Sequence, residues 1–371
     1  MNQSLNIAIL GTRGIPNTYG GFEQFAEYLS VGLVKKGHHV TVYNPNFHDY
    51  EGNNYKGVSI KKIFSPESYI GGAANYIYDY NCLRHALKQN FDIILECGHG
   101  CAVFYYILPI KRSKIFTNMD GLEWKRSKWG FLVRKLAKLN EKLAVKKSDY
   151  LVADNEGIRQ YYIVEYDKNA TTIPYGAVVF DSPQFKSLNK YGIEKRNYFL
   201  LIARLEPENS IEIILDGYDK SQSNCPLLVV GDDSHKYGGY LKNHFSKNEN
   251  IKFLGGIYND EIINNLRYYS RAYFHGHTVG GTNPSLLEAM ACQALIIAHD
   301  NQFNRSVLNE HGTYFTYVND VQNIINNIHK VEENKSKFIK NNLLKIRNKY
   351  NWDKIVKEYE TLFMDSLKKT T

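Results

Sequence analysis

Short apolar runs alternate with amphipathic stretches along most of the chain. In the first half, residues 6–10, 39–44, 91–96, 114–119 and 150–154 have the length of buried strands, and residues 22–37 repeat apolar side chains at helical spacing. The second half has strand-like runs at 198–205, 211–218, 225–232, 251–256, 272–276 and 294–300. Strands that alternate with helices predict parallel sheets covered by helices, which is an α/β fold.

The alternation is interrupted between about residues 175 and 196, where the sequence is polar and irregular. A chain of 371 residues is long enough for two domains with full cores. We therefore predict two Rossmann-like domains, residues 1–180 and 196–350, that face each other across a cleft. A last helix at 351–371 is expected to return to the first domain. Ligands of such sheets bind beyond the carboxyl ends of the strands.

Composition narrows the function classes. The formal charge of +8 is below the density typical of a dedicated nucleic-acid binder, and no base-reading motif accompanies it. Five cysteines at irregular spacing give no disulfide framework and suit a reducing compartment. The start lacks a signal-peptide pattern, and the longest apolar run, 101–110, is about half the roughly 20 residues that a spanning helix needs. These features predict a cytoplasmic protein that does not bind nucleic acid.

The segment 280–285, "GGTNPS", predicts a phosphate site. Asn283 is a favoured N-cap, and Pro284 suits the first helical position. The helix would present free N–H groups and its positive dipole end, while two glycines allow a bulky anion to approach. No Gly-Lys-Ser/Thr follows, so this is not a P-loop. The alternative is a capped glycine turn without a ligand, but Glu288 also lies within about one turn of Pro284 and offers a carboxylate to ribose hydroxyls.

A second glycine-rich turn, residues 11–21, follows the first predicted strand. Its spacing is not G-x-G-x-x-G, and the next strand ends at Asn44 with no acidic residue to bind a ribose. A nicotinamide-dependent dehydrogenase is therefore disfavoured. Gly20 and Gly21 would bring the backbone close to a bound ligand, and Glu23 lies at the start of the next helix.

Several of these motifs resemble a known family. "GGTNPSLLEAMAC", "ARLEPENSIEIILDGY", "GGFE" and "VVGDD" resemble retaining GT-B glycosyltransferases related to glycogen and sucrose synthases. "GTRGIPNTYGGFEQFAEYLS", "DGLEWKRSKWG" and "HGHTVGGTNPSLLEAMA" resemble a bacterial subfamily that includes rhamnosyltransferases of surface-polysaccharide assembly. The resemblance runs from about residue 6 to about residue 360. It implies a GT-B fold and sugar transfer from a nucleotide-diphosphate sugar with retention of configuration, without a cofactor.

The resemblance also implies a donor site, with two departures from the family pattern. The family's glutamate-x7-glutamate pair is reduced to Glu288, because its first position is Gly280. The diphosphate-binding arginine matches Arg204, whereas Asn209 stands where lysine is usual. An alternative for Arg204 is a surface ion pair at a strand end. The remaining candidates for donor binding are His277, Gly281, Thr282, Asn283, Ser285 and, from the first turn, Gly21.

On the acceptor side, Asp120 occupies the position where relatives commonly carry a histidine. It would orient the acceptor hydroxyl or help to take its proton, although Asp120-Gly121 is also a favourable turn dipeptide. With Arg204 and Glu288, Asp120 completes the predicted catalytic set, and Glu123 joins Gly20 and Glu23 as acceptor-side residues. Cys97, His99 and Cys101 are too crowded for a zinc knuckle, and Asp232-Asp233 suits a strand-end turn, so no essential metal is predicted.

Residues 125–147 are strongly basic. Leu132, Leu136, Leu139 and Leu143 recur at helical spacing, which predicts either a helix packed on the sheet with a solvated basic face or a helix that docks on an anionic leaflet. In the docking interpretation the membrane-facing residues are Trp129, Arg134, Lys135 and Lys138. The protein would then be peripheral on the inner face of the cell membrane, in the plane of a lipid-linked acceptor.

Together these features predict a metal-independent glycosyltransferase of cell-surface polysaccharide synthesis. The subfamily likeness suggests dTDP-rhamnose as donor, with a UDP-hexose as its nearest rival, and a lipid-linked saccharide as acceptor. Two alternatives remain. One is a non-hydrolysing sugar-nucleotide epimerase, which shares the fold and needs no acceptor. The other is a non-catalytic partner in a polysaccharide assembly complex, given the missing glutamate and lysine.

Overall fold

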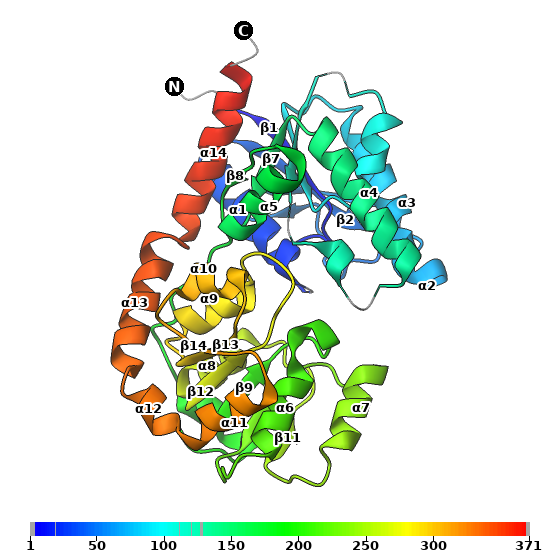
Figure 1. Ribbon diagram of the computed structural model, residues 1–371. Helices are drawn as coiled ribbons and strands as arrows, with labels where there is room; N and C mark the ends of the chain where they lie inside the picture. Colours follow the sequence, from blue (N-terminus) through cyan, green and yellow to red (C-terminus); the bar gives the residue numbers. More distant parts are fainter. Residues whose placement is uncertain (1–3, 19, 111, 120, 127–128, 369–371) are drawn as a thin grey trace. The chain divides into compact units, whose positions relative to one another are not determined.

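The computed structural model describes residues 4–18, 20–110, 112–119, 121–126 and 129–368 (Figure 1). It divides into two compact units. The first contains the chain up to Trp124, the stretch from Trp129 to Tyr175 and the C-terminal stretch from Trp352. The second contains Gly176–Asn351 and a short segment that begins at Lys125.

The first unit alternates strands and helices. Its strands are β1 (Asn6–Leu10), β2 (His39–Pro45), β3 (Asn54–Tyr55), β4 (Val58–Ile63), β5 (Ile93–Cys97), β6 (Lys114–Asn118), β7 (Tyr150–Ala153) and β8 (Thr171–Thr172). Its α-helices are α1 (Gly21–Lys35), α2 (Glu67–Ile70), α3 (Ala74–Ala86), α4 (Phe131–Lys147), α5 (Glu156–Tyr166) and α14 (Trp352–Lys368). Short 3-10 turns are η1 (Gly71–Ala73) and η2 (Ala102–Tyr106), and a third, η3 (Glu123–Lys125), begins in this unit and ends at Lys125 of the second.

In the described part of this unit, the strands form one sheet in the order β3-β4-β2-β1-β5-β6-β7-β8. All neighbours are parallel except β3 and β4. The order reverses at the β1–β5 pair, where Leu10 lies beside Glu96 at the carboxyl ends of both strands. The loops that follow β1, β5 and β6 therefore meet at the ligand-binding edge of the sheet.

The C-terminal helix α14 packs on α1 of the first unit (Figure 1). Its buried residues Trp352, Ile355, Val356, Tyr359 and Phe363 recur at helical spacing and form one apolar face. A Cβ at Gly32 of α1 would lie 2.4 Å from Val356 Cγ2, so only glycine permits this close approach. The rings of Tyr28 and Trp352 stack with centroids 4.7 Å apart.

The second unit repeats the alternation. Its strands are β9 (Phe199–Ile202), β10 (Leu227–Val230), β11 (Ile251–Phe253), β12 (Ala272–His275), β13 (Ile296–His299) and β14 (Thr313–Phe315). Its helices are α6 (Ile211–Asp219), α7 (Lys236–His244), α8 (Asp260–Tyr269), α9 (Pro284–Ala291), α10 (Gln302–Leu308), α11 (Val318–Asn326), α12 (Ile328–Glu332) and α13 (Lys335–Asn348), with the 3-10 turns η4 (Phe185–Tyr191) and η5 (Pro207–Asn209).

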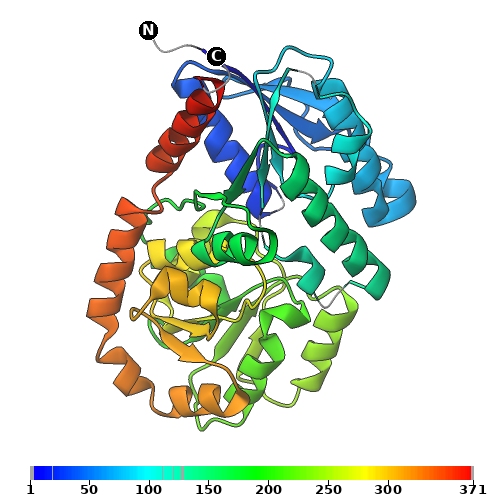
Figure 2. The same cartoon turned by 45° about the horizontal axis from the view of Figure 1, so that its top comes forward.

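Within the described residues, these strands form a parallel sheet in the order β11-β10-β9-β12-β13-β14. Helices α6 and α11 pack together on one face, and α8, α9 and α13 pack on the other (Figure 2). Because both faces are covered, the strands are almost continuously buried and apolar. The α/β fold predicted from the alternation is confirmed.

One predicted strand is wrong. Residues 211–218 were expected to be a strand, but they form most of helix α6. Ile211, Ile214, Leu215 and Tyr218 are buried, and their spacing of three and four residues fits one face of a helix. The alternation of Ile211, Ile213 and Leu215 imitates a strand only locally. Strands β3, β4, β8 and β14 are short or half-exposed and carried no prediction.

Candidate donor site in the second unit

The glycine turn between β12 and α9 has the predicted cap. Asn283 adopts an extended conformation, and its Oδ1 accepts the backbone N–H of Ser285 at 2.9 Å. Pro284 is the first residue of α9, where its missing N–H leaves no bond unmade. Gly280 has φ +120°, a conformation that a residue with a Cβ rarely adopts. The predicted N-cap and helix start are therefore confirmed.

Glu288 forms an ion pair with an arginine for which the sequence predicted no role. Its Oε2 lies 2.6 Å from Nη2 of Arg267 on α8, whose side chain is only 3% exposed. The same Nη2 donates to Ser285 Oγ at 3.1 Å, and the Tyr273 hydroxyl lies 2.8 Å from that Oγ. Ser285, predicted to bind the donor, thus has its hydroxyl engaged inside the protein. No motif around Arg267, within "NNLRYYS", marked it in the sequence.

Two stacked imidazoles, one at the end of strand β12 and one two residues beyond it, precede the glycine turn. The rings of His275 and His277 lie 4.5 Å apart and 16° from parallel. The carbonyl of His277 accepts bonds from the side-chain amides of Asn301 at 3.0 Å and Asn304 at 3.1 Å. Burial first, and then the nearby charge of Arg204, lower the pKa of His277 to about 3. Burial also holds the pKa of His275 well below its usual value, so both rings are neutral at physiological pH.

The loop that follows β9 is tied to the same turn. Arg204 has an exposed side chain, and its carbonyl accepts the Asn209 side-chain N–H at 2.7 Å. Asn209, which stands at the usual lysine position, is 4% exposed and therefore supports this loop. The backbone N–H and the hydroxyl of Thr278 both donate to the carbonyl of Glu208, at 3.1 and 2.8 Å. A Cβ at Gly276 would meet the Asn209 carbonyl oxygen at 2.0 Å. The structure thus brings the Arg204 loop and the glycine turn together.

A small cavity of about 10 Å³ lies in the turn. It is lined by His277, Thr278, Val279, Gly280, Gly281, Asn283, Phe303 and Asn304. Three of the predicted donor-binding residues, His277, Gly281 and Asn283, are in this lining, and Thr282 is buried beside them.

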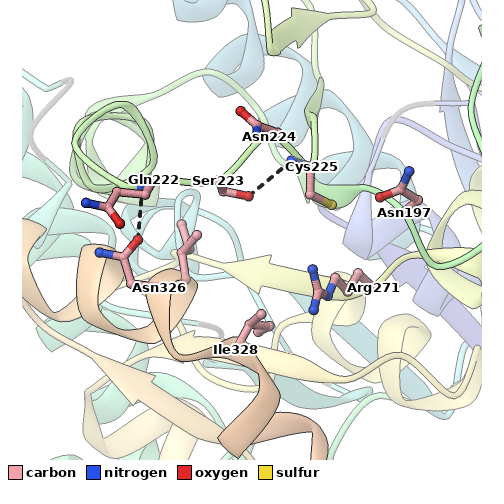
Figure 3. A pocket seen from close by; sticks show the side chains of 9 residues that line it. Asn197, Gln222, Ser223, Asn224, Cys225, Arg271, Asn326 and Ile328 are labelled. Carbon is pink, nitrogen blue, oxygen red and sulfur yellow. Dashed lines mark hydrogen bonds between the residues drawn. The ribbon is translucent and has the colours of Figure 1, made fainter.

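A larger cavity of about 530 Å³ opens at the other edge of the same sheet (Figure 3). Its lining residues Asn197, Cys225 and Arg271 lie just before β9, β10 and β12, so the cavity is at the amino ends of the strands. Its polar groups pair with neighbours: Arg271 binds Glu332 at 3.0 Å, and Asn326 Oδ1 accepts the N–H of Gln222. None of the predicted site residues lines it.

In the first unit, side chains of the β1–α1 loop mainly hold the loop itself. Glu23 is 5% exposed, and its Oε1 accepts the N–H of Arg13 at 2.7 Å. The N–H of Gly20 donates to Asn17 Oδ1 at 3.2 Å, and Gly21 begins helix α1. The structure therefore places Gly20 at the N-cap of α1, and Gly21 and Glu23 in the first turn of that helix.

Two other acceptor-side predictions lie after β6. Asp120 is outside the described residues, whereas Glu123 begins the partly exposed turn η3. Beside this edge, burial and the neighbouring Asp79 raise the pKa of Glu96, a carboxyl group that the sequence did not single out. Among the described residues, no group of three or more His, Cys, Asp or Glu side chains is arranged to hold a metal ion.

The leucine row of helix α4 is exposed, which contradicts the predicted orientation in which this row packs on the sheet. Leu132, Leu136 and Leu139 are 78%, 39% and 48% exposed, so the leucine row does not pack on the sheet. The buried residues near the middle are polar instead. Asn140 donates to the carbonyl of Gly100 at 2.8 Å, which accounts for its burial.

Glu141 is the second buried polar residue of α4 and is fully enclosed. It accepts bonds from Trp124 Nε1 at 3.0 Å, from the hydroxyls of Tyr161 and Tyr166 at 2.6 Å each, and from Lys138 Nζ at 3.0 Å. A buried carboxylate with four donors is well compensated. This cluster fixes which side of α4 faces inward.

The same cluster contains Lys138, one of the residues predicted to face a membrane. Lys138 also pairs with Glu165 at 3.1 Å and lies over the ring of Trp124, so its charge is compensated within the protein. Arg134 and Lys135 are exposed, and Trp129 and Phe131 are 38% and 70% exposed. No helix among the described residues has the length and apolar character required to cross a bilayer.

Two family models match the chain. Residues 183–350 match the glycosyl transferases group 1, and residues 4–178 match a domain of unknown function, DUF1972. An uncharacterised glycosyltransferase from Methanocaldococcus jannaschii is 27% identical over 247 residues, which are 60% of this chain and 60% of that protein.

Solved glycosyltransferases share the fold over nearly the whole chain. A sucrose-phosphate synthase from Thermosynechococcus elongatus has a TM-score of 0.82 at 15% identity, covering 99% of this chain and 100% of its own. Anabaena HepE in complex with UDP-glucose has a TM-score of 0.75 at 14% identity, covering 96% and 98%. The chain therefore has the GT-B fold. The match of residues 183–350 to the model of the glycosyl transferases group 1 supports a transferase enzyme.

Proposed function

We propose that the protein transfers a sugar from a nucleotide-diphosphate sugar to a saccharide acceptor. The observation that carries this proposal is the junction of the Asn283-capped start of α9 with the Arg204 loop, joined through Thr278 and Glu208. Helix N-termini and guanidinium groups are the usual protein partners of phosphate oxygens. The relatives' nucleotide sugars, such as the UDP-glucose bound to HepE, support the same donor class.

In this proposal each donor group has a partner. The diphosphate lies against residues 281–285 and Arg204, and the ribose hydroxyls donate to Glu288. His277 faces the sugar as a neutral imidazole, in place of the carboxylate that is absent at Gly280, with Thr282 and Ser285 shaping the turn. Charge that develops on the departing diphosphate is stabilised by the dipole of α9 and by Arg204, and this stabilisation is the main catalytic contribution.

On the acceptor side, we propose that the acceptor hydroxyl lies near Gly21, Glu23 and Asp120, with Glu123 as a further candidate. The bond from the sugar's anomeric carbon to the diphosphate breaks while the acceptor oxygen bonds to the same face of that carbon. Because the acceptor attacks the same face, the configuration is retained without an enzymic nucleophile. The acceptor's proton passes to a diphosphate oxygen. No metal takes part in this scheme, and transfer that stops in excess EDTA and returns with Mg²⁺ would contradict it.

The primary test is Arg204→Ala. Because Arg204 is exposed, the melting temperature should not change, whereas kcat/KM should fall about 100-fold, as for the loss of one transition-state contact. Lys252→Ala, which removes another exposed cation from the same unit, is the matched control and should transfer normally. Unchanged transfer by a folded Arg204→Ala variant would refute the diphosphate assignment.

For the donor, we propose dTDP-rhamnose, with a UDP-hexose as the rival. A ligand that binds only the folded protein raises its melting temperature, so a thermal-shift series with UDP, dTDP, GDP and their sugars separates the two. Incubation with a UDP-sugar alone tests the epimerase alternative, which predicts a new epimer in the absence of acceptor. A preparation that binds donors but never transfers would favour the non-catalytic alternative.

We further propose that α4 docks on an anionic membrane surface at the inner face of the cell membrane, where a lipid-linked acceptor lies. The exposed leucine row supplies apolar contact, and Arg134 and Lys135 supply positive charge along the same helix. Trp129 suits the polar–apolar boundary. The reversed orientation of α4, with leucines outside and Glu141 inside, is the feature that favours this proposal over a solvated helix.

Vesicle sedimentation tests this docking. Arg134→Glu with Lys135→Glu should abolish binding to vesicles of phosphatidylglycerol and phosphatidylcholine, and Leu132→Ser with Leu136→Ser should weaken it without loss of fold. Lys357→Glu with Lys368→Glu on α14 makes the same change in charge elsewhere on the unit and should leave binding intact. Equal binding by both double reversals would exclude α4 as the docking element.

A further inference from the structure

Arg267 is a buried cation that the transfer scheme above does not use. It lies on α8 with its side chain 3% exposed. Its Nη2 binds Glu288 Oε2 at 2.6 Å and Ser285 Oγ at 3.1 Å, and its Nη1 binds Asn264 Oδ1 at 3.2 Å. Its Nε has no hydrogen-bond partner among the described residues. Three of its contacts therefore fix the guanidinium in one plane beneath α9.

Stability alone is a poor reason for this arrangement. A buried ion pair is often no more stabilising than apolar residues of the same volume, because removing both charges from water is costly. The two partners are also unequally buried, since the Glu288 side chain is 28% exposed and that of Arg267 only 3%. The Glu288 side chain is thus held by the guanidinium on one side and remains partly exposed to solvent.

The contacts around Ser285 extend the same support. The Tyr273 hydroxyl lies 2.8 Å from Ser285 Oγ and donates to the carbonyl of Ile202 at 3.3 Å. Ile202 is the last residue of β9, two positions before Arg204. The first turns of α9 are therefore linked through Arg267 and Tyr273 to the strand that leads to the Arg204 loop.

We propose that Arg267 is a positioning residue that fixes the Glu288 carboxylate toward the ribose hydroxyls of the donor nucleotide. This inference rests on the proposed function, because Glu288 is assigned to the ribose there. Arg267 never touches the nucleotide itself. A guanidinium holds Glu288, Ser285 and Asn264 together through its fixed fork of donors, whereas the single ammonium of a lysine cannot reproduce that geometry.

A chemical double-mutant cycle tests the proposal. Dissociation constants are measured by calorimetry for UDP and 2′,3′-dideoxy-UDP, and for dTDP and 3′-deoxy-dTDP, with the wild type and with Arg267→Lys. In the wild type, loss of the hydroxyls should weaken binding about tenfold or more, because they bond to a charged acceptor. In Arg267→Lys, the intact nucleotides should bind about tenfold more weakly, while the deoxy analogues keep their wild-type affinity.

A purely structural role gives a different result, since it weakens intact and deoxy nucleotides by the same factor and overturns the proposal. Arg271→Lys is the matched control: Arg271 makes a two-pronged bond to Glu332 at 3.0 Å, but at the opposite edge of the sheet. It should leave the ratio of intact to deoxy affinity unchanged. A reduced ratio in this control also overturns the proposal.

A milder variant protects the test against misfolding. Asn264→Ala keeps the bond to Glu288 and removes the contact to Nη1, together with the weak bond that Cys292 Sγ donates to Asn264 Oδ1 at 3.4 Å. It should lower the ratio about two- to threefold. If Arg267→Lys does not fold, this variant decides the question, and an unchanged ratio overturns the proposal. Failure of the proposed function is distinguishable, because a wild type that binds intact and deoxy nucleotides equally contradicts the ribose assignment of Glu288 before any variant is measured.

Discussion

Two glycine-rich turns of the molecule look alike in sequence but are held in different ways. Each connects a parallel strand to a helix, β1 to α1 in the first unit and β12 to α9 in the second. In the first turn, side-chain acceptors take the N–H groups of the turn itself. The donors are Arg13, Gly14, Ile15, Asn17 and Gly20, and the acceptors come from Glu23, Thr12, Asn44, Glu27 and Asn17.

The second turn is supported at its flanks. Thr278 binds the β9 loop, Asn301 binds the His277 carbonyl, Asn283 caps α9, and Arg267 holds Glu288. The first turn is thus held through its own backbone N–H groups, whereas the contacts named for the second turn lie on the segments that flank its glycines. The difference teaches that glycine spacing alone does not show how such a turn is held in the fold.

The largest expected effect is on the first turn. Asn44 is fully buried and binds both the N–H and the carbonyl of Ile15, at 3.1 and 2.7 Å. Asn44→Ala leaves two buried backbone groups unpaired and should lower the free energy of unfolding by about 3 kcal/mol, measured by urea denaturation. The exposed Asn53→Ala is the control. A loss below about 1 kcal/mol would mean that the first turn is not held by Asn44.

A pH effect of about 2 kcal/mol is expected at the second turn. His277 has a pKa near 3 in the folded protein, because of burial, against about 6.5 unfolded. The unfolded chain binds the proton first, so stability is present above pH 6.5 and is lost as the pH falls from 6.5 toward 3. The single group contributes a loss of about 2 kcal/mol between pH 7 and pH 5.

Urea denaturation of the ligand-free protein across that range measures this loss. His277→Gln should remove it, so that the variant's stability falls less steeply with acid than that of the wild type. His235→Gln, at an exposed position, should leave the slope unchanged. Parallel curves for the wild type and His277→Gln would show that the imidazole is not kept neutral by burial.

A smaller effect is expected at the cap of the second turn. Asn283→Ala removes one N-cap bond and should lower the free energy of unfolding by about 1 kcal/mol. Asn259 caps α8 in the same way, with Oδ1 accepting the N–H of Ile262 at 3.0 Å, and Asn259→Ala should have a similar effect on stability. Only Asn283→Ala should also weaken binding of UDP or dTDP. Equal nucleotide affinity in both variants would contradict a phosphate site at α9.

The sequence predicted those structural features that are determined by residues close together in the chain. Alternating apolar runs predicted the α/β fold, and Asn283 followed by Pro284 predicted the start of α9, because capping depends on residues within one turn. The run at 211–218 misled because strand and helix spacing coincide over a few residues. Local pattern also left open which face of α4 is buried, since that depends on Trp124, Tyr161 and Tyr166 around Glu141.

The residues that hold the candidate site in place were not predicted, because their contacts are also tertiary and not local. Arg267 lies in a helix with no motif, and its meaning comes from Glu288 and Ser285 on another helix. Asn301 and Asn304 act through the carbonyl of His277, which no side-chain pattern records. Residues that touch a ligand can carry a motif, whereas residues that hold them are specified only by the tertiary structure.

The smallest expected effect is that of Glu23→Gln, which tests whether Glu23 only supports the loop or also binds the acceptor. Its Oε1 accepts the Arg13 N–H, and the amide oxygen of glutamine can accept the same bond. Glu23→Gln should therefore change the free energy of unfolding by less than about 1 kcal/mol and the acceptor KM by about threefold at most. Glu23→Ala leaves the Arg13 N–H without this acceptor and should be clearly less stable. A different result is possible: Glu23→Gln keeps its fold and donor affinity but raises the acceptor KM more than about tenfold. The carboxylate then binds the acceptor directly, and the first turn is a binding element as well as a structural one.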